Sequence, residues 1–321
     1  MLAVFAASID REDPLSGLSI GEQPDPSERD GWTTVSVRAA SLNHHDVWSL
    51  RGVGMTEERL PMILGCDAAA VDEDGNEVVV YSVITSEDWR ADETFDPRRS
   101  ILSERHPGTF AERVSVPRRN LIPKPPELSF SEAACLPTAW LTAYRMLFTR
   151  GGVTPGSTIL VQGSSGGVAT ALTVLGGAAG IRVWVTGRSE HKREQALALG
   201  ADQAFEPGTR LPERVDAVME TTGEATWAHS IRSLKPGGTI VISGATTGDA
   251  PPAELRRVFF QQLSIVGSTM GTRDELERLI RLCVDKDVRP AIHATFALAD
   301  ARQGFESLLD GEVVGKVVLT V

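Results

Sequence analysis

The sequence predicts an α/β protein that combines a doubly wound parallel sheet with a second, β-rich domain. From Thr158 onward, short apolar strand patterns alternate with helical ones, as is typical of a parallel sheet with helices on both faces. Before about Pro123 the pattern is strand and loop instead. A glycine-rich turn joins an apolar strand to an apolar helix within residues 158–175. Two domains are therefore expected in this chain of 321 residues.

The individual elements follow from local periodicity and from turn residues. The first region has β-rich runs at 33–40 and 78–82, a charged loop at 87–99, and a stiff proline connector at 123–126. Strands are predicted at 158–161, 182–186, 203–205, 217–220, 239–243, 263–268 and 315–321. Helices are predicted over 131–148, 190–199, 226–234 and 273–284.

The turn after the strand at 158–161 has the composition of a phosphate-binding loop. Glycine lets the backbone approach a pyrophosphate, and the N–H groups and dipole of a helix start favour its charge. The strict G-x-G-x-x-G spacing is absent, so the flanking strand and helix strengthen the prediction. The residues expected to hold the phosphates are Gly163, Ser164, Ser165, Gly166, Gly167 and Val168.

A second polar turn follows the strand at 182–186, where a doubly wound sheet reads the adenosine ribose. It contains Gly187, Arg188 and Ser189, with Lys192 one turn later, and no acid stands at the strand end to accept from a ribose 2′-hydroxyl. Because an arginine accommodates a 2′-phosphate, we predict NADPH as the cofactor. Ser189 can also serve as an ordinary helix N-cap, and both interpretations can hold together.

The bulk composition narrows the possible partners. The formal net charge of −11 argues against nucleic acid and anionic membranes as partners, and no apolar run has the length of a membrane span. Three widely spaced cysteines, Cys66, Cys135 and Cys283, indicate free thiols in a reducing compartment. Residues 1–7 read as a first strand and not as a signal peptide, so a cytoplasmic protein is expected.

Several short motifs occur in an order and spacing that are specific when taken together. They are residues 41–52 (SLNHHDVWSLRG), 61–67 (PMILGCD), 108–112 (GTFAE), 132–144 (EAACLPTAWLTAY), 199–202 (LGAD), 243–248 (SGATTG), 267–271 (GSTMG) and 315–316 (GK). Through them the chain resembles the medium-chain dehydrogenase/reductase superfamily over nearly its whole length. The resemblance implies a GroES-like domain at residues 1–123, completed by about 290–321, a Rossmann domain at 124–289, and an active site in the cleft. It also implies a homodimer paired through the sheet edge near residues 263–268.

The departures from this family concern its zinc sites. The positions where zinc alcohol dehydrogenases ligate the catalytic ion resemble Asn43, Cys66 and Thr138, so one soft ligand of three remains. The region of the structural-zinc lobe, residues 82–106, has no cysteine. The chain thus resembles a zinc-free branch close to quinone oxidoreductases, although its local motifs look nearest to a zinc-type subgroup. An unusual metal site from Cys66, Asp67, His44 or His45 is the alternative.

The resemblance also suggests which residues act. Asn43, His45, Asp46 and Thr138 are the catalytic candidates, and Thr142, Gly244, Ala245, Thr246, Ser268, Thr269 and Lys316 join the cofactor-binding set. His44 and His45 are the candidate proton donors by their ordinary pKa. The alternatives are structural: Asn43 and Asp46 as turn and cap residues, the threonines as helix packing, and Lys316 as a solvated side chain.

The expected function is an NADPH-dependent reductase that transfers hydride to a quinone or an α,β-unsaturated carbonyl without zinc. No tyrosine stands near residues 51–54, where enoyl-thioester reductases of the superfamily use one, which lowers the expectation of a thioester substrate. Two alternatives are a zinc alcohol dehydrogenase with aberrant ligands and a non-catalytic NADPH-binding sensor or crystallin-like protein. The glycine loop cannot separate them, because all three need it.

Overall fold

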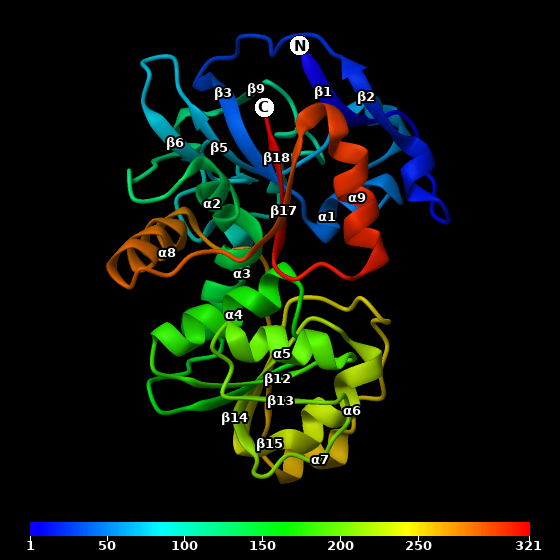
Figure 1. Cartoon of the computed structure of the whole chain (residues 1–321), viewed down its shortest axis with the longest axis vertical. Helices are drawn as coiled ribbons and strands as arrows, with labels where there is room; N and C mark the ends of the chain where they lie inside the picture. The colour runs from blue at the N-terminus through cyan, green and yellow to red at the C-terminus, as the bar shows by residue number, and fades with distance from the viewer. The chain divides into compact units, whose positions relative to one another are not determined.

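The computed structural model describes residues 1–321, and the chain divides into two compact units. Unit 1 comprises Met1–Ala139 and Gly271–Val321, and unit 2 comprises Trp140–Met270 (Figure 1). The predicted boundaries near 123 and 290 differ from these limits. Helix α2 (Phe130–Ala134) packs on strands of unit 1, and Arg273 at the start of α8 donates to the backbone oxygens of Arg119 and Leu121. Side-chain packing therefore extends unit 1 beyond the proline connector.

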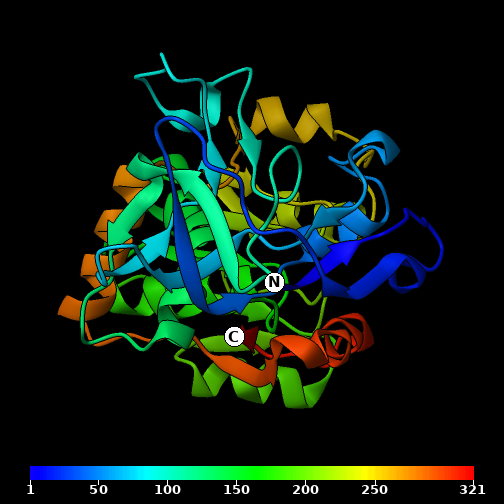
Figure 2. The ribbon, with the colours of Figure 1, turned by 90° about the horizontal axis from the view of Figure 1, so that it is seen from above.

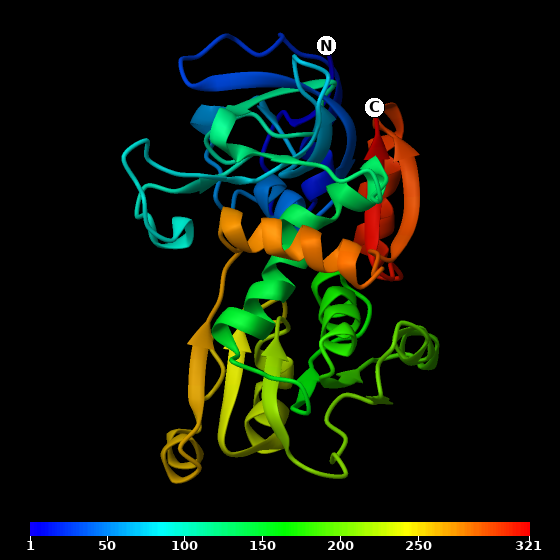
Figure 3. The same cartoon turned by 90° about the vertical axis from the view of Figure 1, so that its left-hand side faces the viewer.

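Unit 1 is built around a seven-stranded sheet in the order β10-β6-β5-β3-β18-β17, with β9 pairing to β3. A three-stranded sheet, β2-β1-β4, and the pair β7-β8 complete it. Figure 2 shows that both chain ends lie in this unit, and Figure 3 shows β17 and β18 side by side at one edge. The strands are β1 (Leu2–Ala6), β2 (Leu18–Glu22), β3 (Trp32–Ser41), β4 (Met62–Ile63), β5 (Asp67–Val71), β6 (Glu77–Val80), β7 (Val83–Ile84), β8 (Ser100–Ile101), β9 (Arg113–Pro117), β10 (Leu121–Pro123), β17 (Ile292–Ala297) and β18 (Lys316–Thr320).

Three helices join α2 in unit 1. They are α1 (His44–Leu50), α8 (Arg273–Asp285) and α9 (Ala301–Asp310). Residues of β3, β5 and β18 alternate into a core that includes Val37, Ala68 and Val317, as expected for a sheet with one face against a hydrophobic core. Segments from the two ends of the chain thus share one core.

Unit 2 confirms the predicted parallel sheet. Its six strands all pair in parallel in the order β13-β12-β11-β14-β15-β16, which is a 3-2-1-4-5-6 arrangement. The central strands β11 and β14 are almost fully buried, because helices cover both faces. The strands are β11 (Thr158–Val161), β12 (Arg182–Thr186), β13 (Gln203–Phe205), β14 (Val215–Glu220), β15 (Leu234–Ile242) and β16 (Ser264–Gly267). The helices are α3 (Leu141–Tyr144), α4 (Gly167–Ala178), α5 (Glu190–Ala198), α6 (Glu224–Ser233) and α7 (Leu255–Phe260).

No helix of the structure has both the length and the apolar character that crossing a bilayer requires. All three cysteines are unpaired and buried.

Candidate active site

Strand register gathers a polar network in unit 1. Ser41 pairs with Asp67 across β3 and β5, and with Val318 across β3 and β18. Lys316 at the start of β18 is thereby brought to the same end of the sheet. Its Nζ donates to Leu42 O at 2.7 Å and lies 3.3 Å from Asp67 Oδ2. The network is almost completely removed from water, and its polar groups bond to one another except Asp67 Oδ1, which has no partner.

Asn43 connects the members of this network. Its Oδ1 accepts from Lys316 Nζ at 2.6 Å, and its Nδ2 donates to Asp67 Oδ2 at 2.8 Å. The Ser41 hydroxyl donates to the same Asp67 oxygen at 2.9 Å. The side chain of Asn43 is 8 % exposed, and both ends of its amide are engaged. Lys316 likewise finds its partners within unit 1, and its predicted contact with the pyrophosphate stays a prediction.

The three positions that correspond to catalytic zinc ligands do meet in space. Asn43 Nδ2 lies 3.6 Å from Cys66 Sγ, and Cys66 Sγ lies 3.4 Å from Thr138 Oγ1. Catalytic zinc takes nitrogen, thiolate or carboxylate ligands, whereas here an amide and a hydroxyl hydrogen-bond to a thiol. These inherited zinc positions therefore do not fit a zinc ion, and the chemistry below contains no step through one.

A second group surrounds His45 at the start of α1. His45 Nε2 lies 3.3 Å from Glu104 Oε1, and His45 Nδ1 lies 3.9 Å from Asp46 Oδ1. One ligand atom each from His45, Asp46 and Cys66 falls within 4.8 Å of the others. The alternative metal site considered from the sequence thus involves Asp46 in place of Asp67. His44, the neighbouring candidate, is exposed.

The electrostatics of this group favour a charged imidazole beside a neutral thiol. Burial lowers the pKa of His45, but the adjacent Asp46, Cys66 and Glu104 side chains favour the charged imidazole, outweigh burial and raise that pKa well above 6.5. Burial and the neighbouring Asp67 charge raise the pKa of the Cys66 thiol. Cys66 is therefore a hydrogen-bonding thiol and not an activated nucleophile.

In unit 2 the glycine turn leads from β11 directly into α4. Gly163 has φ +100°, a backbone conformation that favours glycine, and its N–H donates to Thr186 Oγ1 at 3.1 Å. Gly166 is the N-cap of the 12-residue helix α4, which has no side-chain cap. The turn, Gly163 to Val168, lies at the carboxyl end of β11 beside β14, the place where the strand order reverses. This is the position of a phosphate site in doubly wound folds.

The second polar turn packs against the first. A Cβ on Gly187 would lie 2.6 Å from Ser164 Oγ, so the two turns are in close contact and a larger residue there would require the Ser164 side chain to move. Arg188 is exposed beyond it, and the Ser189 hydroxyl caps α5 by accepting from the Lys192 N–H at 3.3 Å. The Lys192 side chain is buried. The arginine is thus the cation of this turn that remains accessible to a ligand.

The remaining predicted cofactor contacts follow the neighbouring strands. Gly244, Ala245 and Thr246 come after β15, and Ser268 and Thr269 come after β16. Ser268 N donates to Ile242 O at 2.8 Å, while its buried Oγ has no partner. Thr142 lies in α3 and is buried in unit 2, whereas Thr138 belongs to unit 1.

Sequence reasoning missed two acidic side chains. Glu104 lies in a loop with no motif, and only the fold places it beside His45. Glu220 is fully buried at the end of β14, where its carboxylate accepts from the N–H groups of Thr222 and Gly223 and from the hydroxyl of Ser230. The sequence did offer a signal for Glu220, because this acidic residue stands at the end of a predicted strand. Glu220 fixes the turn at Thr222 and Gly223, next to the glycine turn.

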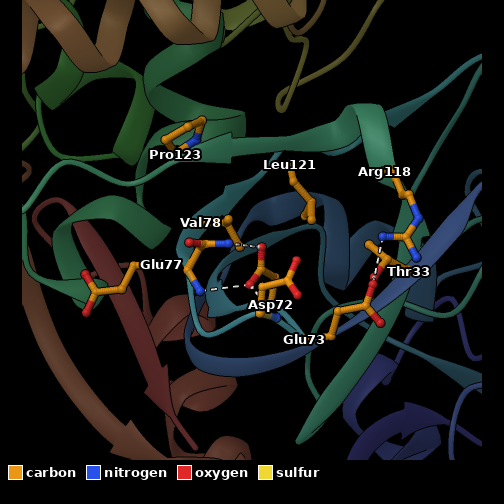
Figure 4. Close-up of a pocket in the computed structure, with 10 residues that line it drawn as sticks. Thr33, Asp72, Glu73, Glu77, Val78, Arg118, Leu121 and Pro123 are labelled. Atoms are coloured by element: carbon orange, nitrogen blue, oxygen red, sulfur yellow. Dashed lines mark hydrogen bonds and ion pairs between the residues drawn. The ribbon is translucent and has the colours of Figure 1, made fainter.

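A hollow of about 360 Å³ in unit 1 contains none of these residues (Figure 4). Glu73 accepts from Thr33 Oγ1 at 3.3 Å and from Arg118 at 2.7 Å, and Asp72 accepts from Asn76 at 3.0 Å. The polar groups therefore satisfy one another around a surface turn. We assign no ligand to this hollow.

The strand order, the glycine turn at its reversal and the β-rich unit with its polar network define a two-domain, nucleotide-binding oxidoreductase. Two family models match: "Alcohol dehydrogenase GroES-like domain" over residues 29–126 and "Zinc-binding dehydrogenase" over 167–285. The chain belongs to the medium-chain dehydrogenase/reductase superfamily, among the relatives of zinc-type alcohol dehydrogenases. The resemblance inferred from the motifs is confirmed.

Individual relatives match nearly the full length of the chain. A crystal structure of an NAD-dependent alcohol dehydrogenase is 34 % identical, with a TM-score of 0.92 and complete coverage of both chains. Acryloyl-coenzyme A reductase from Metallosphaera sedula is 28 % identical over 95 % of this chain and 96 % of its own length. The 2-octenoyl-CoA carboxylase reductase CinF, solved with NADP and 2-octenoyl-CoA, is 25 % identical, with a TM-score of 0.90 over 99 % of this chain and 87 % of its own.

Proposed function

We propose that this protein is an NADPH-dependent reductase of α,β-unsaturated carbonyl compounds, and that it needs no zinc at the inherited positions. The observation that carries this proposal is the mutual hydrogen bonding of Asn43, Cys66 and Thr138, which leaves no zinc ligand set there. The relatives named for acryloyl-CoA and 2-octenoyl-CoA support a conjugated acceptor and bring thioesters back into consideration. Quinones are the second acceptor class to test.

The cofactor supplies the hydride, and the chain supplies position, charge and a proton. When bound, NADPH would supply a hydride for the β-carbon of the acceptor, and the chain would supply the proton that the α-carbon takes up. Because both ends of the Asn43 amide are engaged internally, Asn43 positions Lys316 and Asp67. Asp46 and Glu104 flank His45 and orient its ring.

His45 is the proposed proton donor. It is the partly exposed imidazole of the group, with 21 % of its side chain accessible. Thr138 assists by holding the Cys66 thiol through its hydroxyl. A positioned proton donor contributes about 10²–10⁴-fold to a rate, so His45→Gln is expected to lower kcat within that range.

The preference for NADPH rests on Arg188 and on the absence of an acid at the end of β12. An exposed guanidinium can bind a ribose 2′-phosphate through two parallel hydrogen bonds. The glycine turn at the α4 N-terminus would hold the pyrophosphate. The solved complex of the CinF relative with NADP supports the same choice.

A second candidate function is a metal-dependent alcohol dehydrogenase with NAD. The alcohol dehydrogenase of 34 % identity favours it, and so does the grouping of His45, Asp46 and Cys66. It differs from the main proposal in its substrate, its cofactor and its sensitivity to chelators.

A homodimer is part of the proposal. Strand β16 forms an unpaired edge of the unit 2 sheet, and the preceding helix α7 exposes Leu255, Phe259 and Phe260 by 65–71 %. A second copy of the chain would cover this apolar helix and extend the sheet across the edge. In sedimentation velocity, wild type should be dimeric and Phe259→Asp should be shifted toward monomer.

The test is steady-state oxidation of NADPH and NADH with enones, enoyl thioesters, quinones and aldehydes, with and without a chelator. NADPH oxidation by a conjugated carbonyl, not lowered by the chelator, is expected. The matched control for His45→Gln is His106→Gln, because His106 is a partly buried imidazole elsewhere in unit 1. Aldehyde reduction lost on chelation would establish the second candidate instead. Tight NADPH binding without turnover of any acceptor would refute both.

A further inference from the structure

Several buried polar atoms in or beside α1 have no hydrogen-bond partner, Ser49 Oγ and Arg51 Nε among them. Two of these atoms face each other: His45 Nδ1 and Asp46 Oδ1 lie 3.9 Å apart. Buried polar atoms are nearly always paired, so an orphan nitrogen and an orphan carboxylate oxygen side by side call for a ligand or a proton between them. The thiol of Cys66 lies within 4.8 Å of both residues' ligand atoms.

We propose that His45, Asp46 and Cys66, the His–Asp–Cys cluster, bind one divalent cation of borderline softness such as Zn²⁺ or Co²⁺. An imidazole nitrogen, a carboxylate oxygen and a thiolate sulfur are the donors that such ions take, and three of them leave a fourth position open. Binding would displace the Cys66 thiol proton and the proton on the ligating imidazole nitrogen of His45 to solvent. This ligand set shares only Cys66 with the inherited zinc positions.

Surrounding residues already hold the ligands in place. Asp46 Oδ2 accepts from the Asn43 N–H at 2.7 Å, which leaves Oδ1 free to point at the site. Glu104 Oε1 lies 3.3 Å from His45 Nε2, so a carboxylate fixes the ring nitrogen opposite the proposed ligand atom. Glu104 is in turn fixed by the Ile101 N–H, which donates to its Oε2 at 2.9 Å. A carboxylate behind a ligating histidine is the usual support of a metal site.

The neighbouring Asp67 shows why the site lies at Asp46. The charge of Asp67 is already balanced by the Lys316 ammonium, and Asn43 and Ser41 also donate to the same oxygen. Asp46 has no cation of its own besides His45. The imidazole side chain is 21 % exposed, which provides a path for an ion from solvent.

Occupation of the cluster would remove His45 from proton transfer. This consequence rests on the proposed function, whereas binding itself does not. A bound cation is therefore expected to inhibit the reductase, and its removal to restore the rate. The site would make enzyme activity sensitive to free divalent metal.

The experiment titrates chelator-treated full-length protein with Co²⁺ and reads absorbance without any substrate. One Co²⁺ per chain is expected, with a thiolate-to-cobalt charge-transfer band and the intense visible bands of four-coordinate cobalt. Cys66→Ser should abolish the charge-transfer band, whereas Cys283→Ser, which alters a buried thiol outside the cluster, should keep it. Glu104→Gln should weaken cobalt binding by about 10–100-fold. Circular dichroism establishes that each variant is folded.

Absence of the band in wild type, or its persistence in folded Cys66→Ser, would overturn the proposal. Reductase rates measured on the same samples form the second arm. A rate that falls with cobalt occupancy supports the inhibitory role, and a rate that is unchanged or rises overturns that role. A protein that shows the band but never reduces an acceptor would retain the metal site and lose the proposed function.

Discussion

Replacing Lys316 with methionine should destabilise unit 1 strongly. The Lys316–Asp67 pair is 2 % and 0 % exposed, and the substitution leaves the carboxylate buried without its cation. It also removes the donor to Leu42 O and to Asn43 Oδ1. Breaking a buried pair by removing one partner costs about 3–5 kcal/mol. In a domain of 150–250 residues, each kcal/mol of lost stability lowers Tm by ~2–4 °C. The expected decrease in Tm is therefore about 6–20 °C.

The assay is differential scanning calorimetry of the full chain, together with urea unfolding followed by circular dichroism. Calorimetry is needed because two units can unfold in separate transitions. The matched control is Lys235→Met, whose partner is Asp216. In that pair the side chains are 42 % and 37 % exposed, so a loss of only about 0–1 kcal/mol is expected.

The double variant Lys316→Met/Asp67→Asn tests the cause. It removes the buried negative charge, while the amide introduced at position 67 keeps an oxygen that can accept from Ser41 and Asn43. Most of the lost stability should return, because the cost arises from an uncompensated charge and not from the missing ion pair. A loss below about 1 kcal/mol in Lys316→Met, or a further loss on adding Asp67→Asn, would refute the reasoning.

Three further predictions concern other parts of the chain. Gly65→Ala should destabilise unit 1 by about 2–4 kcal/mol in urea unfolding. The φ of Gly65 is +91°, and a Cβ there would clash with the buried Phe110 ring. An unchanged free energy of unfolding would contradict this prediction. Burial alone would raise the pKa of Asp216, but the hydrogen bond from Lys235 holds it below 3.8, so Asp216 stabilises the fold above that pH. Asp216→Asn should therefore lower Tm at pH 7. The difference from wild type should begin to shrink as the pH falls below about 3.8 and vanish as the pH passes through the lower native pKa; a constant difference would be inconsistent with it. Arg188→Ala should raise KM for NADPH and leave KM for NADH nearly unchanged, and a parallel change in both would exclude a 2′-phosphate contact.

The local sequence pattern was sufficient to predict the parallel sheet of unit 2. The predicted strand bounds at 158–161, 182–186 and 203–205 agree with β11, β12 and β13. Each βα turn there is formed by residues adjacent in sequence, so glycine content, capping residues and apolar runs contain the needed information. The boundary of the two units was less accessible, because α2 and α8 join unit 1 through side-chain packing and not through a turn signal.

By itself, the sequence determined the class of fold, the glycine turn before α4, the position of Arg188 after β12 and the absence of zinc-type side chains at Asn43 and Thr138, since all of these are properties of residue type in a local pattern. Only the tertiary structure decided how the polar side chains pair. Lys316 and Asn43 are 273 residues apart, and His45 and Glu104 are 59 apart. Strand register and loop path place them in contact, and no local pattern encodes which buried carboxylate a lysine will neutralise or which imidazole nitrogen will be left unpaired.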